Sequence, residues 1–427
     1  MKKFLILLLL FSINLASAQP SDLESQLFNL PDVVFKKIET PEGFISAYEL
    51  KIRQPIDHKH PEKGHYYQRA YLSHVGADRP MVICTEGYHR PTNRVYELST
   101  LLNANQIDVE HRYFGESIPE GVGYEYLNLE QATADLHRVN QIFREIYAGK
   151  WLSTGISKGG QTTIYYRYFY PDDVDVSVPF VAPLNRALEE KRIYTFLDTV
   201  GTDECRQKIF KVQKRILENR EAALDKLWWY NKGAGNEFTY LTFEEAFEYA
   251  VLEYPFSFWQ LGHSCNVIPG DDASLDQLLD YFLTVSGLDF FADKGMKDFA
   301  SHYYQAGDEM GYYSYRTDAF KGLLKALPMK PNPTAIFMPE KEMKKNFDGK
   351  LPAAASKWVD EKGNNFIYIN GDSDTWSSTA VRPSGKTNAV FFFMPDTDHS
   401  KARIKYMNEA DKAKVISTLE KWLGMDF

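Results

Sequence analysis

A serine flanked by glycines is the feature that most constrains the fold of this chain. Gly155, Ser157 and Gly159 form a G-x-S-x-G pattern that follows an apolar run at residues 151–155 and opens a helical stretch. Small neighbours let the backbone turn sharply from a strand into a helix, which lifts the serine Oγ out of the sheet. The helix N-terminus also stabilises negative charge that develops beside it. The pattern predicts a strand–turn–helix unit with Ser157 as a nucleophile, so a base and an acid must be found elsewhere.

Short β-rich runs alternate with helical periodicity around this serine. Residues 129–147, for example, place Leu136, Val139 and Phe143 on one stripe, as in an amphipathic helix. Such alternation is typical of an α/β fold with a mostly parallel sheet covered by helices on both faces. The expected strands in this part of the chain are residues 68–72, 81–84, 106–109, 151–155 and 174–181.

The middle of the chain changes character and is expected to form a helical insertion. Residues 184–330 are charged and aromatic with little strand pattern, and helices are expected at residues 206–227 and 242–252. Neither flanking half has enough strands to close a sheet alone, so we expect one core, interrupted by a helical cap. Strands return at residues 335–338, 366–369 and 389–394, and a helix at 411–423 closes the chain; the core parts are then 19–183 and 331–427.

The N-terminus is predicted to be a secretory signal peptide over residues 1–18. Lys2 and Lys3 precede an apolar run at residues 4–11, and a small-residue site predicts cleavage after Ala18. The run is too short for a membrane span, and no cysteine at the cut would accept a lipid. We therefore expect an exported, periplasmic or secreted protein without a membrane anchor.

Charge and cysteine content limit the partners and cofactors. The chain has 49 basic and 58 acidic residues, a formal net charge of −9, which disfavours nucleic acid as a partner. Cys84 lies in a buried-looking strand, so Cys205 and Cys265 are the expected disulfide in an oxidising compartment. The ten histidines show no metal-ligand spacing, and C-x-x-C and H-E-x-x-H motifs do not occur. Neither a metal nor a cofactor is expected.

A serine hydroxyl needs a base to take its proton, and that base must be oriented by an acid. In an α/β-hydrolase fold both follow the serine, in the order acid and then histidine. His263 and His302 fall in the expected insertion, whereas His399 lies in a turn directly after the strand at residues 389–394. His399 is therefore the expected base for Ser157.

The acid and the oxyanion hole are expected in turns after other strands. Asp372 and Asp374 both follow the strand at residues 366–369, and the residues alone leave the choice between them open. The tetrahedral intermediate needs two main-chain N–H donors. Lys158 supplies one, with a side chain that needs no role beyond solvation, and Gly87 or Tyr88 supplies the other from the turn after residues 81–84.

With these residues in place, the chain resembles the secreted prolyl tripeptidyl aminopeptidases and, more distantly, the lysosomal prolyl carboxypeptidase and dipeptidyl peptidase family. The matching segments are residues 54–58, 85–88, 110–117, 155–160, 170–175, 253–259, 304–311 and 370–376. The resemblance implies an α/β-hydrolase core, a helical cap over the site and cleavage after proline near a peptide end.

The resemblance also assigns individual positions. The family's acid loop reads N-G-x-x-D-P-W, which selects Asp374 and places Thr375 where the relatives have proline. Lys158 stands where the lysosomal relatives have a bulky residue, which brings the chain closer to the tripeptidyl branch. The segment with Arg112 and Glu116 is expected to be a structural network near the oxyanion loop.

Substrate contacts follow from the same resemblance. Glu86 and Glu309 are the candidates for binding a substrate ammonium, and Trp259 and Trp376, with Tyr254 and Phe258, for a proline pocket. The sequence thus predicts an exported serine exopeptidase that releases di- or tripeptides through Ser157, His399 and Asp374. An esterase or lipase on the same fold, or a catalytically idle binding protein that keeps it, are the alternatives.

Overall fold

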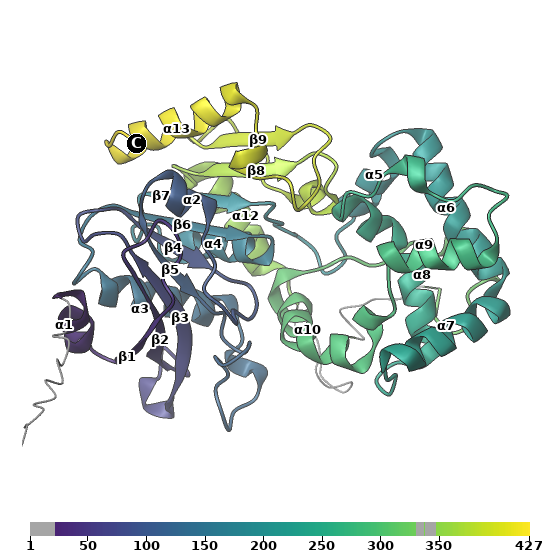
Figure 1. Cartoon of the computed structure of the whole chain (residues 1–427), viewed down its shortest axis with the longest axis horizontal. Helices are drawn as coiled ribbons and strands as arrows, with labels where there is room; N and C mark the ends of the chain where they lie inside the picture. The colour runs from purple at the N-terminus through teal and green to yellow at the C-terminus, as the bar shows by residue number, and fades with distance from the viewer. Residues whose placement is uncertain (1–21, 330–336, 338–346) are drawn as a thin grey trace, which may run out of the picture.

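One nine-stranded sheet runs through the computed structural model, which describes residues 22–329, 337 and 347–427 (Figure 1). Its spatial order is β1-β2-β3-β5-β4-β6-β7-β8-β9, and the six strands from β5 to β9 in this order pair in parallel. The strands are β1 Val33–Ile38, β2 Ser46–Pro55, β3 His65–His74, β4 Met81–Thr85, β5 Asn105–Val109, β6 Trp151–Ile156, β7 Val176–Phe180, β8 Ile367–Gly371 and β9 Val390–Met394.

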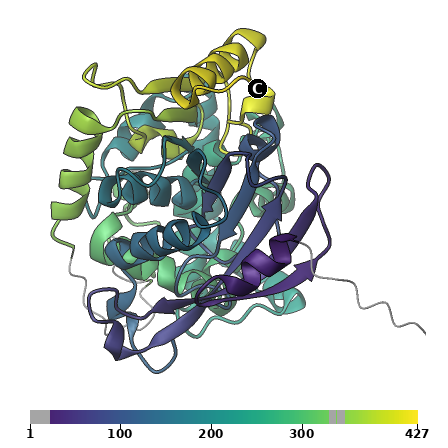
Figure 2. The ribbon, with the colours of Figure 1, turned by 90° about the vertical axis from the view of Figure 1, so that its left-hand side faces the viewer.

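The strands expected from the sequence within the described residues occur, but two others were missed. β1 and β2 form the antiparallel edge of the sheet, beside helix α1, Asp22–Asn29 (Figure 2). β1 has no buried residue and carries Lys36 and Lys37, so it lacks the apolar run that marks the central strands. The expected strand at residues 335–338 lies outside the described residues, apart from Phe337.

Helices cover both faces of the sheet because alternate strand residues point to opposite sides. In β4, Val82 and Cys84 pack with α2 and α13, whereas Met81 and Ile83 pack with α3. The helices that cover the core are α2 Glu97–Leu101, α3 Leu129–Phe143, α4 Lys158–Phe169, α12 Lys350–Lys362 and α13 Glu409–Leu423. This arrangement is the predicted α/β-hydrolase fold.

A group of helices that we call the cap helices lies between β7 and β8 in sequence and beside the sheet in space (Figure 1). β7 and β8 are parallel neighbours, so the sheet continues after this insertion. The cap helices are α5 Arg192–Thr199, α6 Asp203–Glu218, α7 Arg220–Ala234, α8 Phe243–Gln260, α9 Leu275–Val285 and α10 Asp293–Gln305. A disulfide joins Cys205 to Cys265. In the described residues we find no helix that is both long and apolar enough to cross a bilayer.

The helices differ from the expected ones in two places. The single helix expected over residues 206–227 is wrong, because the chain leaves helical geometry at Asn219 and forms α6 and α7 instead. Helix α8 continues past residue 252 to Gln260 although it contains Pro255. Proline has no N–H to donate to the carbonyl four residues earlier. The Gln213 side chain donates to that carbonyl, at Val251, over 2.7 Å and so satisfies it.

Candidate active site

Ser157 occupies the sharp turn between β6 and α4. Its φ of 58° and ψ of −123° are unusual for a residue with a side chain, and its N–H donates to the Phe180 carbonyl over 2.9 Å. The glycines make the turn possible by close packing: a Cβ on Gly155 would lie 2.3 Å from the Gly159 oxygen. One on Gly159 would lie 2.5 Å from the Thr85 oxygen. The sequence pattern therefore encodes a backbone geometry that larger residues would block.

His399 and Asp374 meet at the carboxyl ends of β9 and β8. The His399 Nδ1 lies 2.7 Å from the Asp374 Oδ2, and the aspartate side chain is fully buried. The Trp376 N–H also donates to Asp374 over 3.1 Å. Asp372, the other candidate acid, is exposed and bonds instead with its neighbour Ser373. The geometry therefore pairs His399 with Asp374.

Helix α8 holds both of these loops from the cap side. The His399 N–H donates to the Gln260 carbonyl over 3.1 Å, and the Thr375 hydroxyl donates to the Phe256 carbonyl over 2.9 Å. Gln260 and Phe256 line one cavity together with Ser157. The end of α8 thus connects the histidine and aspartate loops to the space in front of the serine.

Lys158 is buried, so the expectation of a solvated side chain is wrong. Its Nζ donates to the Gly87 carbonyl over 2.5 Å and to the Gln305 Oε1 over 2.7 Å, and it lies over the Phe114 ring. Burial lowers the pKa of Lys158 well below its ordinary value, which the nearby Glu309 partly opposes. A Cβ on Gly87 would lie 2.6 Å from the Lys158 side chain. The turn after β4 therefore packs directly against the residue that follows the serine.

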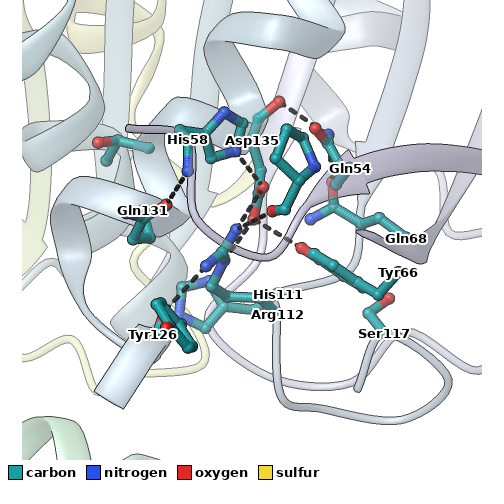
Figure 3. Close-up of polar contacts among 12 residues, drawn as sticks. Gln54, His58, Tyr66, Gln68, His111, Arg112, Ser117, Tyr126, Gln131 and Asp135 are labelled. Carbon is teal, nitrogen blue, oxygen red and sulfur yellow. Dashed lines mark hydrogen bonds and ion pairs between the residues drawn. The ribbon is translucent and has the colours of Figure 1, made fainter. Parts of the chain in front are cut away.

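A buried polar network lies next to this turn, because the His111 N–H donates to the Tyr88 carbonyl over 3.2 Å. Figure 3 shows the network around His111 and Arg112. His111 lies 3.1 Å from Gln305, the residue that also accepts from Lys158. The adjacent Arg112 is fully buried and binds both oxygens of Asp135 at 2.7 Å. Burial alone would raise the pKa of Asp135, but Arg112 and His58 lower it to about 2. Since Arg112 and Asp135 are buried and paired with each other, they form a structural support, as expected for the Arg112 segment.

The cavity in front of Ser157 has a volume of about 360 Å³ and lies between the core and the cap helices. Its lining includes Lys158 and Tyr88, which the sequence singled out for the oxyanion hole, and Trp376. Aromatic rings form much of the wall: Phe256 stacks on Tyr313 with ring centroids 4.0 Å apart. The other aromatic residues on this wall are Tyr312, Phe290, Phe291 and Phe299. Trp259 instead lines a second cavity, on the other side of α8.

The two glutamates expected to bind substrate have other partners. Glu86 is buried and pairs with Arg90 at 2.6 Å and Arg94 at 2.9 Å. The Leu129 N–H, at the start of α3, donates to Glu309 over 2.5 Å, and burial raises the pKa of this glutamate to about 8. Neither side chain is among those that line the cavity with Ser157.

Glu253 is the buried carboxylate that does line this cavity, and residue-by-residue sequence reasoning did not single it out. Burial raises its pKa to about 7, against the hydrogen bonds it accepts from Tyr315, Tyr313 and Ser257. One signal could have found it: Glu253 interrupts an otherwise apolar and aromatic stretch of α8, where a charge is costly.

The described residues contain no cluster of three or more His, Cys, Asp or Glu side chains that could hold a metal ion.

Comparison with known proteins identifies the family of this chain. Residues 16–426 match the family model of the PS-10 peptidase S37. The chain is 31% identical to the prolyl tri/tetrapeptidyl aminopeptidase of Streptomyces mobaraensis over 418 residues, which cover 96% of this chain and 86% of the relative.

Two solved structures align with the chain at low sequence identity. The proline iminopeptidase of Mycobacterium smegmatis aligns with 88% of this chain and 97% of its own, at 10% identity and a TM-score of 0.39. VinJ aligns with 92% of this chain and 99% of its own, at 11% identity and a TM-score of 0.42. Because the family model spans nearly all of the sequence, the chain belongs to the S37 peptidase family and is a serine-type peptidase with an α/β-hydrolase fold.

Proposed function

We propose that this protein is an exported exopeptidase that removes short peptides ending in proline from the N-termini of its substrates. Ser157 is the nucleophile, His399 the general base and acid, and Asp374 the residue that orients His399. The observation that carries this proposal is the 2.7 Å contact between His399 Nδ1 and Asp374 Oδ2, because it leaves Nε2 free to take the serine proton.

The reaction follows from these roles. Ser157 Oγ attacks the carbonyl carbon of the proline while its proton passes to His399 Nε2. The tetrahedral intermediate collapses to an acyl-enzyme as His399 gives that proton to the leaving amine. Water, deprotonated by His399, then attacks the ester, and the peptide acid leaves as the proton returns to Ser157. No cofactor takes part in these steps.

The oxyanion is stabilised by two main-chain N–H groups in this proposal. One is the N–H of Lys158, at the start of α4. The other is the N–H of Tyr88. Because a trans peptide points its N–H opposite to its carbonyl, holding the Gly87 carbonyl at Lys158 Nζ directs the Tyr88 N–H away from the lysine amine.

The choice of proline as the residue before the cleaved bond is supported by the aromatic wall of the cavity. A proline side chain is a rigid apolar ring that packs well against aromatic faces. Trp376 lies 5.1 Å from Phe256 and 5.7 Å from Tyr312, centroid to centroid, and all three line the cavity with Ser157. The Streptomyces relative, named for prolyl tri/tetrapeptidyl aminopeptidase activity, supports the same assignment.

Export rests on the leader, residues 1–18, which lie outside the described part of the chain. Expression of the full chain in a bacterial host should give a mature protein that begins at Gln19, as read by mass spectrometry of its N-terminal peptide. Recovery of the uncleaved chain from the cytoplasm alone would contradict export.

The test of the reaction compares the enzyme with Ser157→Ala on three substrates: Ala-Ala-Pro-p-nitroanilide, its N-acetylated form and p-nitrophenyl acetate. We expect the enzyme to cleave the free tripeptide substrate and to label with a fluorophosphonate, and Ser157→Ala to do neither while keeping its thermal unfolding temperature. Cleavage of the ester with no cleavage of either peptide would identify an esterase. Full peptidase activity in Ser157→Ala would overturn the nucleophile assignment.

A further inference from the structure

We propose that Glu253 is the carboxylate that binds the free α-ammonium group of the peptide substrate. This proposal rests on the proposed function and adds the residue that makes the enzyme an aminopeptidase. It replaces Glu86 and Glu309, whose side chains are engaged outside the cavity.

The position of Glu253 is the first argument. It lies on α8, one turn before Ser257 and two turns before Gln260, and it lines the same cavity as Ser157. The residue is only 7% exposed, so an ion pair formed there would be poorly screened by solvent. A charged substrate terminus that enters the cavity would therefore meet a carboxylate at a position where the attraction between opposite charges is strong.

The hydrogen bonds of Glu253 are the second argument. The Ser257 hydroxyl donates to Oε1 over 3.0 Å, while the Tyr313 and Tyr315 hydroxyls donate to Oε2 over 2.8 Å and 2.7 Å. These donors fix the orientation of the carboxylate. An ionised carboxylate accepts about four hydrogen bonds, so Oε1 retains capacity for a further donor. An ammonium group supplies donors of this kind.

The missing counter-ion is the third argument. Other buried carboxylates have an arginine nitrogen within 3.3 Å, namely Glu86, Glu110, Asp135 and Glu248. Across residues 22–329, 337 and 347–427, no Lys, Arg or His forms an ion pair with Glu253. The basic side chains that share its cavity, Lys158 and His302, are buried, and burial lowers the pKa of both well below the ordinary value. An ionised carboxylate at this position would therefore gain a charge partner from a cationic ligand that enters the cavity.

The experiment compares kcat/KM for Ala-Ala-Pro-p-nitroanilide with kcat/KM for its N-acetylated form, in the enzyme and in Glu253→Gln. Glutamine keeps the size of the side chain and an acceptor for the tyrosines but removes the charge. We expect the enzyme to prefer the free N-terminus, and Glu253→Gln to lose about 10- to 100-fold on that substrate with little change on the blocked one. The preference for a free N-terminus should therefore collapse.

Glu248→Gln is the matched control, because Glu248 is a buried carboxylate on the same helix that binds Arg220 and the N–H groups of residues 325–327, away from the cavity. Its preference for the free N-terminus should equal that of the enzyme. Fluorophosphonate titration of Ser157 counts the folded sites in each variant, so a misfolded fraction does not enter the comparison.

Two results would overturn the role of Glu253 while leaving the peptidase intact. One is an equal loss on free and blocked substrates in Glu253→Gln, which would make the residue structural. The other is an enzyme that cleaves both substrates equally well. Failure of the enzyme to cleave either peptide is a different result. It would overturn the proposed function itself, and with it the role of Glu253 in binding the substrate ammonium group.

Discussion

The side-chain amine of Lys158 donates to the main-chain carbonyl of Gly87 over 2.5 Å, from the position directly after Ser157. The same amine donates to Gln305, which also contacts His111. The buried lysine therefore ties three separate segments together: the start of α4, the turn after β4 and the end of α10. Its side chain fixes the peptide whose N–H is the second oxyanion donor in our proposal.

Lys158→Met tests this relationship. The substitution keeps most of the volume but releases the Gly87 carbonyl, so the Tyr88 N–H loses its fixed direction. We expect kcat for Ala-Ala-Pro-p-nitroanilide to fall by about 10- to 1,000-fold with little change in KM, because oxyanion donors act mainly in the transition state. The Gly87 and Gln305 oxygens lose their donor, which should lower the free energy of unfolding by about 1 to 3 kcal/mol each, so kcat is compared per site that a fluorophosphonate labels. A rise in KM at constant kcat would contradict a role in positioning the oxyanion donor.

The choice of acid is tested by a pair of variants. Asp374→Asn keeps the shape of the side chain but favours the wrong tautomer of His399, so we expect kcat to fall about a thousandfold or more. Asp372→Asn changes an exposed residue two positions away and should leave kcat within about twofold of the enzyme. Equal losses of kcat in the two variants would show that catalysis depends on the conformation of the loop and not on the His399–Asp374 pair.

The preference for a free N-terminus should depend on pH through two groups. Glu253, with a pKa of about 7, must lose its proton to bind the ammonium, and the substrate amine must keep its own, which it loses at about pH 8. The ratio of kcat/KM for free to N-acetylated substrate should therefore rise as pH increases toward 7 and fall above about 8. Because both substrates react through the same catalytic residues, the ratio reports the binding of the free N-terminus. Asp289 is the other carboxylate at this cavity and is exposed to solvent. A flat ratio would contradict the role of Glu253.

The ionisation of Glu253 should also make the stability of the folded protein depend on pH, in the direction opposite to substrate binding. The pKa of Glu253 is raised from 4.5 to about 7 in the folded protein, so between these values the folded state holds more protons than the unfolded chain. Its contribution to stability is therefore complete below about pH 4.5 and is lost as pH rises through 7. Glu253→Gln lacks this loss, so its free energy of unfolding relative to the enzyme should increase by about 1 to 3 kcal/mol from pH 5 to pH 8. Urea unfolding at the two pH values measures it, and a constant difference would contradict the raised pKa.

The disulfide between Cys205 and Cys265 spans 60 residues, from the start of α6 to the turn after α8. Replacing both cysteines with serine should lower the free energy of unfolding by about 2 to 4 kcal/mol. Dithiothreitol should destabilise the enzyme to a similar extent and leave the double variant unchanged, as urea titrations would show. Because α8 holds the His399 loop, activity should be lost at lower urea concentrations in the double variant. Equal unfolding midpoints would contradict a stabilising bond.

The sequence by itself predicts the features of this protein that depend on local backbone geometry and on the order of residues along the chain. The glycines around Ser157 encode the strand-to-helix turn, because a Cβ at Gly155 or Gly159 would overlap main-chain atoms. Short apolar runs in the sequence predict the strands that are buried on both faces, such as β4 and β6. The order of acid and histidine placed His399 and either Asp372 or Asp374 after neighbouring strands, and the family's acid loop selected Asp374.

Other features had no local signal. β1 is an edge strand with no buried residue, so hydrophobicity does not mark it, and Asn219 ends α6 without a proline or glycine. Lys158 is polar in the sequence but buried in the fold, because Gly87, Phe114 and Gln305 close around it from distant segments.

Glu253 shows most clearly which features the sequence determines and which depend on the tertiary structure. The sequence determined that a glutamate interrupts an apolar helix, and so that a charge must be stabilised somewhere in the cap helices. Only the tertiary structure decided that its partners are Ser257, Tyr313 and Tyr315, that no arginine reaches it within the described residues, and that it faces the cavity of Ser157. The physical reason is that burial and electrostatic pairing depend on contacts between segments far apart in the chain, which local sequence patterns do not encode.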